Sequence, residues 1–231
     1  METLVTKKVS LVLPSQWGEN MEVKDRILEK AADLFMKYGI RSITMDEIAS
    51  QLGISKKTIY QFFTDKDEIV EGVIDQVIQR NQNECKRFKG NAENAVHEVF
   101  VALEEMEDML KAMNPLIMYD LEKYHPKAYK KFKNHKYQFM YAVIRENLER
   151  GMKEENYREG MDVDIVSKQR IESAFMGFNQ DLFPHNRYRV SEVSYELAIL
   201  YLHSVASPKG KKLIEKYLTE RKNTLSHVQK L

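Results

Sequence analysis

Apolar residues recur at helical spacing along nearly the whole chain, and no segment shows a convincing strand pattern. The first periodic segment covers residues 23–38. Its apolar face consists of Ile27, Ala31, Leu34, Phe35 and Tyr38. Gly39 follows at the position where a helix commonly ends. The pattern therefore predicts an all-α fold.

Three helix starts follow at short intervals. Thr44 begins a capping box with the glutamate three residues later, and Ser55 and Asp65 are N-cap candidates for the next two starts. Gly53 permits a tight turn between the first two helices. Two short helices joined by such a turn, behind a longer supporting helix, are typical of a helix-turn-helix. We expect it within residues 21–68.

The remaining helices are longer. We place them at 66–88, 92–113, 115–123, 127–151, 162–181, 191–205 and 209–223, separated by breaks at glycine and proline. Residues 69–231 should form a larger helical domain. Its boundary should lie within the helix that begins near Lys66, because no flexible linker is visible. Residues 1–20 precede the periodic pattern and are expected to be a disordered tail or an extension.

Composition narrows the possible functions. A formal net charge of +1 excludes a uniformly basic nucleic-acid coat but leaves room for a local patch. The single cysteine, Cys85, excludes an internal disulfide and a thiolate zinc site. It suits a reducing compartment, so we expect a cytoplasmic protein. No apolar run approaches the ~20 residues that span a bilayer, so no membrane partner is expected.

Enzyme chemistry finds little support. The chain has no glycine-rich phosphate loop, no nucleophile elbow and no Cys–His constellation. Its carboxylates fall beside lysines on helix surfaces, as they do on solvated faces. His125 and His135 match no standard zinc spacing. We therefore expect no catalytic residue, no metal and no cofactor.

Three lysines occupy unusual positions. With Ser55 and Asp65 as N-caps, Lys56, Lys57 and Lys66 lie in the first turns of two consecutive helices. Cations are disfavoured at the positive end of a helix, whereas a phosphate there is favoured. The pattern suggests that the three ammonium groups share one exposed edge that nucleic-acid phosphates complete. The alternative is a solvated helix face.

The residues between these lysines divide into two faces. Ile59, Phe62 and Phe63 should point into the core of the small domain. Thr58, Tyr60 and Gln61 should then point outward with the lysines. Hydroxyl groups can bond phosphate, and a glutamine can bond an adenine edge in the major groove.

The segment ITMDEIASQLGISKKTIYQFFTDKDEIV, preceded by ILEKAADLFMKYG, resembles the DNA-binding domain of TetR-family (tetracycline-repressor-like) transcriptional regulators. The resemblance implies a recognition helix at 56–62. It implies phosphate contacts from Thr44, Thr58, Tyr60 and Lys66, and base contacts around Lys56, Lys57 and Gln61. Lys57 departs from the small residue common at its position. The candidate DNA-binding residues are thus Thr44, Ser55, Lys56, Lys57, Thr58, Tyr60, Gln61 and Lys66.

Beyond residue 70 the resemblance implies a helical regulatory domain that dimerises near the C-terminus and encloses a small-molecule pocket. Apolar stripes in 162–181 and 191–223 could form a four-helix dimer interface; alternatively they seal the monomer's own core. We expect a homodimer, because a small helix-turn-helix usually binds DNA as a two-fold pair.

Methionine adapts to irregular apolar ligands, so methionines and aromatic residues of this half are candidates for a pocket. They could equally form ordinary core. The candidate ligand-binding residues are Met106, Met109, Met113, Met118, Phe139, Met140, Tyr141, Phe175 and Met176. They suggest a small apolar or amphipathic effector. Six lysines lie between Lys123 and Lys136 and could attract an anion or more DNA, or form a solvated face.

These observations lead to a functional hypothesis. The protein is expected to be a ligand-responsive transcriptional regulator, a repressor, that binds a pseudo-palindromic site in double-stranded DNA as a dimer and is released by its effector. Two alternatives stay open. One is a helical adaptor that docks a protein through its helix-turn-helix, and the other is a DNA-binding regulator without a small-molecule effector.

Overall fold

The computed structural model describes residues 22–228, without the side chains of 224–228, so the expected tail at 1–20 lies outside the described residues. Within the described residues the fold is helical, with one isolated bridge between Tyr157 and Ala206. This confirms the predicted all-α fold. None of the described helices has the length and apolar content needed to cross a bilayer.

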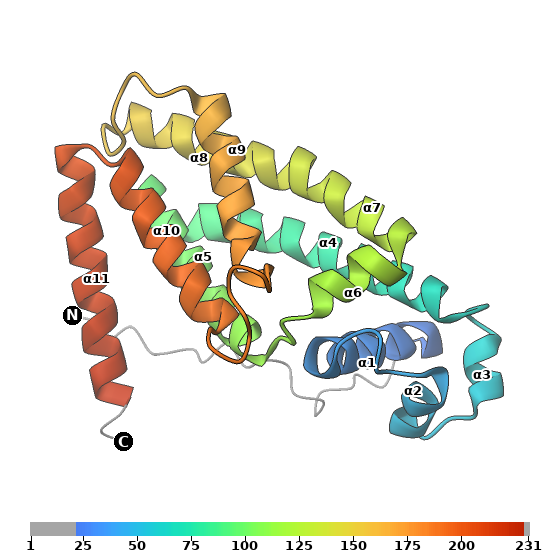
Figure 1. Ribbon diagram of the computed structural model, residues 1–231. Helices are drawn as coiled ribbons and strands as arrows, with labels where there is room; N and C mark the ends of the chain where they lie inside the picture. The colour runs from blue at the N-terminus through green and yellow to red at the C-terminus, as the bar shows by residue number, and fades with distance from the viewer. Residues whose placement is uncertain (1–21, 229–231) are drawn as a thin grey trace.

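The molecule is elongated, with its first helices at one end and its last helix at the other (Figure 1). The head contains α1 (Val23–Tyr38), α2 (Met45–Leu52) and α3 (Lys56–Tyr60). The long α4 (Lys66–Asn91) leads from the head into the body. The body contains α5 (Ala95–Ala112), α6 (Ile117–Tyr124), α7 (Pro126–His135), α8 (Tyr141–Lys153), α9 (Val163–Phe175), α10 (Val190–Val205) and α11 (Pro208–Val228).

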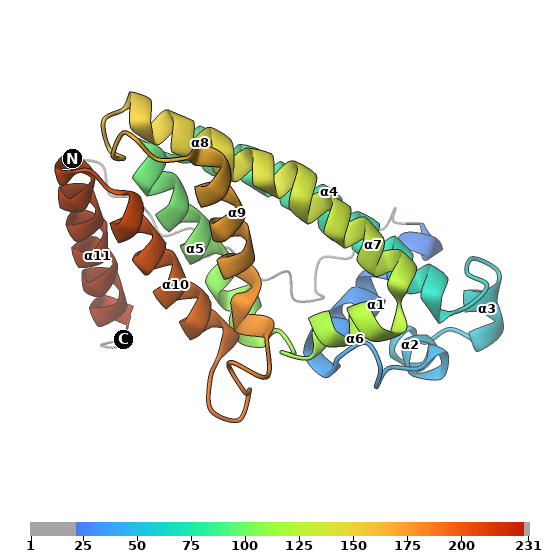
Figure 2. The ribbon, with the colours of Figure 1, turned by 45° about the horizontal axis from the view of Figure 1, so that its top comes forward.

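The predicted helices agree with the observed ones within a few residues, with one difference of kind. The segment expected as one helix at 127–151 is α7, a π-helical turn at Lys136–Met140, and α8. These pieces form one continuous rod that runs beside α4 (Figure 2). The break expected from Gly151 to Gly160 is present but begins a little later, because α8 continues to Lys153.

Two hydrophobic cores hold the molecule together. The head core contains the buried residues of α1–α3 and the first turns of α4, and it also takes in Leu121 of α6 and Ala128 of α7. The body core joins α5, α8, α10 and α11 around Phe100, Leu148 and Ile214. The apolar face of α11 therefore belongs to the monomer's own core.

Polar contacts fasten α6 to the head. The Asn114 N–H donates to the Met36 carbonyl at 2.6 Å, and the Arg41 N–H donates to Asp120 Oδ2 at 2.9 Å. On the following turn, buried His125 contacts the Asp67 carboxylate. Because these bonds grip the end of α1 and the start of α4, α6 and the head should move together.

The lysine-rich stretch is used partly for packing. Lys131 bridges Glu71 and Asp75 of α4, and buried His135 contacts Asn81 at 2.8 Å. These contacts, with that of His125 to Asp67, give Lys131 and both histidines a structural role. Three of the lysines are exposed on α7: Lys127, Lys130 and Lys133.

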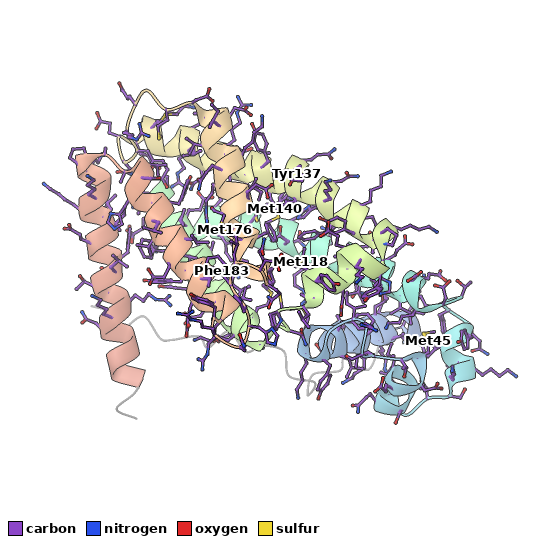
Figure 3. All side chains as sticks on the ribbon, in the orientation of Figure 1. Met45, Met118, Tyr137, Met140, Met176 and Phe183 are labelled. Carbon is purple, nitrogen blue, oxygen red and sulfur yellow. The ribbon has the colours of Figure 1, made fainter. Side chains whose placement is uncertain are left out.

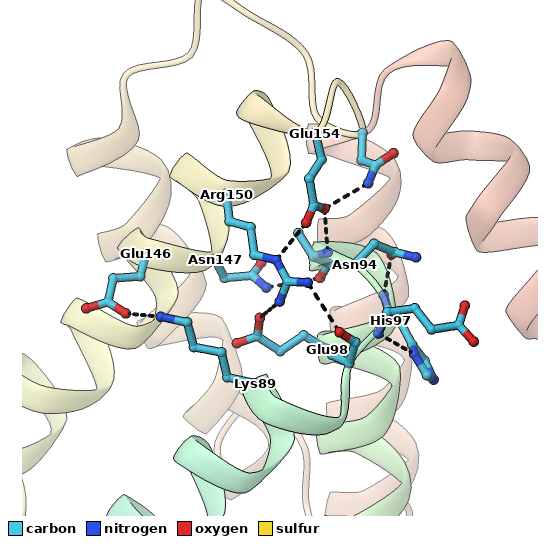
Figure 4. A network of polar contacts seen from close by, with 12 residues as sticks. Lys89, Asn94, His97, Glu98, Glu146, Asn147, Arg150 and Glu154 are labelled. Carbon is cyan, nitrogen blue, oxygen red and sulfur yellow. Dashed lines mark hydrogen bonds and ion pairs between the residues drawn. The ribbon is translucent and has the colours of Figure 1, made fainter.

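A polar network closes the far end of the body (Figure 4). Arg150 binds Glu154 at 2.6 Å, Glu98 at 3.3 Å and the Ala92 carbonyl at 3.2 Å. Beside it, the fully buried Tyr157 donates its hydroxyl to the Ala95 carbonyl. Every charge in this cluster is therefore paired.

The Tyr157 ring occupies the place that a side chain at Gly151 would need. A Cβ there would lie 2.0 Å from the ring. We expect Gly151→Ala to lower the free energy of unfolding by about 1–3 kcal/mol through overpacking, although alanine is the better helix former. Gly90→Ala on α4, where nothing lies within 4 Å, is the matched control and should raise it by up to about 1 kcal/mol. Urea unfolding measures both, and equal effects would contradict the packing explanation.

Candidate nucleic-acid interface

Local capping shapes the helix-turn-helix as the sequence predicts. Thr44 accepts from the Glu47 N–H while the Glu47 carboxylate accepts from the Thr44 N–H, so the capping box is confirmed. Ser55 and Asp65 cap α3 and α4 through the N–H three residues on. Gly53 has φ 66° and ψ 28°, a left-handed conformation that glycine adopts without strain.

One inward-facing residue was assigned wrongly. Ile59 and Phe63 are buried in the head core, but Phe62 is 37% exposed. The helix ends at Tyr60, and the Phe63 N–H donates to the Ile59 carbonyl across the next turn. This turn brings Phe63 inward and leaves Phe62 outside.

The outer surface of α3 presents a small group of exposed residues. Lys57 and Gln61 are exposed, and the Tyr60 side chain is 49% exposed. The hydroxyls of Ser55 and Thr58 lie 2.9 Å apart beside them. Together these residues offer a cation, hydroxyls and an amide on one face, a chemistry suited to phosphate and base edges.

Lys56 has a partner within the head. Its ammonium binds Asp46 Oδ2 of α2 at 2.7 Å, and this hydrogen bond raises the pKa of Lys56. The carboxylate supplies the negative charge that the positive helix end lacks. The position of this lysine is therefore explained without a nucleic acid.

Lys66 is a second correction. Its ammonium does not join an exposed edge but donates to the Ile40 carbonyl at 2.5 Å and lies 5.9 Å from the centroid of the Phe35 ring. Partial burial lowers the pKa of Lys66. The expectation that three ammonium groups crowd one exposed edge is wrong, because only Lys57 points outward without a contact to the described residues.

The nine candidate ligand-binding residues belong to neither hydrophobic core. Eight are half-buried, and Met109 is exposed. Figure 3 shows Met118, Met140 and Met176 in the middle of the molecule, between the head and the far end of the body. The middle is therefore lined by adaptable apolar side chains that neither core packs tightly.

A pocket of about 260 Å³ lies elsewhere, between α5, α10 and α11. Polar residues dominate its wall, including Glu107, Ser194, Tyr195 and Arg221. None of the nine predicted ligand-binding residues lines it. Arg221 of α11 and Glu107 of α5 both line this pocket and form an ion pair at 2.6 Å. Sequence spacing does not reveal this contact between distant helices.

Comparison with known proteins gives an independent view of the head. Residues 27–73 match the family model described as bacterial regulatory proteins, tetR family. YvaF of Bacillus subtilis, an uncharacterized HTH-type transcriptional regulator, is 31% identical over 105 residues, which are 45% of this chain. YerO of the same organism is 34% identical over 68 residues, or 29% of the chain. The chain spans about half the length of YvaF (55%) and 24% of YerO.

Solved structures share the fold over 80% of the chain. A TetR-family transcriptional regulator from Agrobacterium tumefaciens has a TM-score of 0.64 at 13% identity, covering 80% of this chain and 97% of its own. A transcriptional regulator from Saccharomonospora viridis, crystallised with choline, has a TM-score of 0.63 at 19% identity with the same coverage. At these identities the likeness shows the fold alone.

The burial of Lys66 leads to a stability prediction. We expect Lys66→Met to lower the free energy of unfolding by about 1–3 kcal/mol, because a charged hydrogen bond is lost and the Ile40 carbonyl loses its short partner. Lys57→Met, the exposed control, should change it by less than about 0.5 kcal/mol. Thermal unfolding monitored by circular dichroism compares them. Equal stability of the two variants would mean that Lys66 has no structural role.

Proposed function

The chain belongs to the TetR family of bacterial regulatory proteins, and on that premise we propose that it is a dimeric, ligand-responsive repressor of transcription. Each α3 enters the major groove of one half of a pseudo-palindromic site, and an effector bound in the body releases the dimer from DNA. The protein acts in the cytoplasm. The family match over the head, on the same residues that form the helix-turn-helix, is the observation that supports this most strongly.

The exposed face of α3 decides which residues we assign to DNA. Lys57 and Gln61 are the base-contacting candidates, and Thr44, Thr58 and Tyr60 are the phosphate-contacting ones. Ser55 stays beside them as the cap of α3. Lys56 reaches a phosphate only by leaving Asp46. We assign Lys66 to the attachment of α4 rather than to phosphate.

We place the dimer interface on the outer surface of α9 and α10, which run antiparallel in Figure 1. Ile165 on α9 and Leu200 on α10 are each 63% exposed. Ile165 and Leu200 are equally far, in residues, from the ends of α9 and α10 that the connecting segment joins. Because the two helices are antiparallel, these residues lie at the same height along the pair. An exposed pair of large aliphatic residues is the kind of surface that a second copy covers.

Effector control is supported by the loosely packed middle of the molecule and by α6. Eight of the nine candidate residues are half-buried, and Met118 is part of α6 itself. This helix and the residues just before it hold the head through the bonds of Asn114 to Met36 and of Asp120 to Arg41. The regulator of similar fold from Saccharomonospora viridis was crystallised with choline, so a protein of this fold can hold a small molecule. A ligand that binds one position of α6 more tightly shifts the equilibrium between the two positions of the head. The free energy of that shift is no larger than the difference in the ligand's affinity for the two states.

Selection from a random-sequence DNA pool tests DNA binding. We expect enrichment of a two-fold symmetric site, and a steep loss of affinity with salt. Lys57→Ala should weaken the selected site by about tenfold and alter base preference at one position per half-site. Lys130→Ala on the exposed side of α7 is the charge-matched control and should leave base preference unchanged. No enrichment at low salt would favour the protein-docking adaptor instead.

The dimer interface has its own test. Leu200→Glu should raise the dimer dissociation constant roughly 30-fold or more, because it places a carboxylate in the apolar centre of the interface. Val77→Glu, at an exposed apolar position on α4, should leave it unchanged. Sedimentation velocity over a concentration series measures both. An unchanged dimer in Leu200→Glu would remove α10 from the interface.

A further inference from the structure

The guanidinium of Arg170 on α9 has no carboxylate partner among the described residues, although the residue is only partly exposed. Its Nη1 is buried and has no hydrogen-bond partner in the described part of the chain. The guanidinium carbon lies 5.0 Å from the centroid of the Tyr201 ring on α10. Burial lowers the pKa of Arg170, and the groups that oppose this are the phenols of Tyr201 and Tyr157 rather than any carboxylate.

Such an arrangement is unfavourable unless something completes it. Arginine keeps its charge under all ordinary conditions, so this side chain cannot neutralise itself. The cation–π contact with one aromatic ring offsets only a small part of the free energy that burial of an unpaired ion costs. Arg150 of the neighbouring α8 shows the contrast, because two carboxylates and a carbonyl surround its guanidinium (Figure 4).

Further donors accompany the guanidinium. Ser167 lies three residues before Arg170 and therefore on the same side of α9. Its Oγ is also buried without a hydrogen-bond partner among the described residues. Burial raises the pKa of Tyr201, which keeps its hydroxyl protonated as a donor. The set combines a planar fork of N–H groups with hydroxyls, which suits the oxygens of a carboxylate or phosphate.

The same side of α9 continues toward the apolar middle of the molecule. Ala174 follows Arg170 by four residues, which is helical spacing, and the 3-10 turn Met176–Phe178 continues from the end of α9. Phe175 and Met176, in the same region, are half-buried and belong to neither core. An acidic group at Arg170 would thus be adjacent to surfaces suited to an apolar remainder.

We propose that the effector is an amphipathic organic acid whose carboxylate or phosphate pairs with Arg170 between α9 and α10, assisted by Ser167 and Tyr201. This inference rests on the proposed function, since it names the chemical class of the effector that acts on the body. The apolar part of the acid lies against the half-buried methionine and phenylalanine side chains.

Thermal unfolding of the full chain tests the pairing directly. The probes are octanoate, benzoate and octyl phosphate, each beside its uncharged counterpart, 1-octanol or benzyl alcohol. We expect at least one acid to raise the melting temperature of the wild-type protein by roughly 3–6 °C at about ten times its dissociation constant, and its alcohol to do far less. Comparison of octanoate with octyl phosphate separates the two oxyanions.

The variants locate the effect. Arg170→Met should abolish the response to the acid without lowering the melting temperature of the free protein, because an unpaired buried charge is removed. Arg170→Lys, which keeps the charge but not the fork, should retain part of the response. Arg145→Met, on the exposed side of α8 where Arg145 pairs with Glu149, is the matched control and should respond like the wild type.

Several results would overturn the proposal. These are the failure of all acids to stabilise the wild type, equal effects of an acid and its alcohol, or an undiminished response in Arg170→Met. A shift of Arg170→Met toward monomer in sedimentation, with the acid response intact, would place the guanidinium at the subunit interface instead. Failure to enrich an operator would defeat the proposed function alone, because the stabilisation by acids is measured without DNA.

Discussion

Burial of the first turns of α4 in the head core is the contact on which the rest of the structure depends. Ile69, Val70 and Val73 are buried there in the core that α4 shares with α1. The same helix, a rod that is 26 residues and roughly 40 Å long in all, runs on into the body. Because α7 follows this rod through Lys131 and His135, the orientation of the head is set by side chains of the body. A change in the body therefore has a rigid route to α3.

The distribution of paired and unpaired charge separates structural from functional positions. In the head, Lys56 has Asp46 and Lys66 has the Ile40 carbonyl, so neither ammonium awaits a ligand. At the far end of the body, Arg150 is likewise surrounded. Of these four cations, Arg170 alone has a buried side-chain nitrogen, Nη1, without a hydrogen-bond partner among the described residues. A protein tolerates such a residue where a partner outside the chain completes it, and this physical reasoning favours a ligand there.

Much of the head could be predicted because its determinants are local. A cap forms between residues three apart, so Thr44, Ser55 and Asp65 were identified from spacing alone, and each cap is present. Predictions that depended on distant residues did less well. Phe62 is exposed because the helix ends at Tyr60, before its predicted end at residue 62, and Lys66 is directed by a carbonyl 26 residues away in the chain. The pocket between α5, α10 and α11 could not be predicted from the periodicity of apolar residues, because its wall combines helices that are far apart in sequence.

By itself the sequence determined the helical fold, the order of its elements and the helix-turn-helix, since periodicity and capping act over a few neighbouring residues. Only the tertiary structure decided which cations are paired, why Gly151 cannot carry a side chain, and where Arg170 lies. Those outcomes depend on atoms that long-range packing brings together. A lysine at the start of a helix looks the same in sequence whether a carboxylate, a carbonyl or solvent faces it in the folded chain.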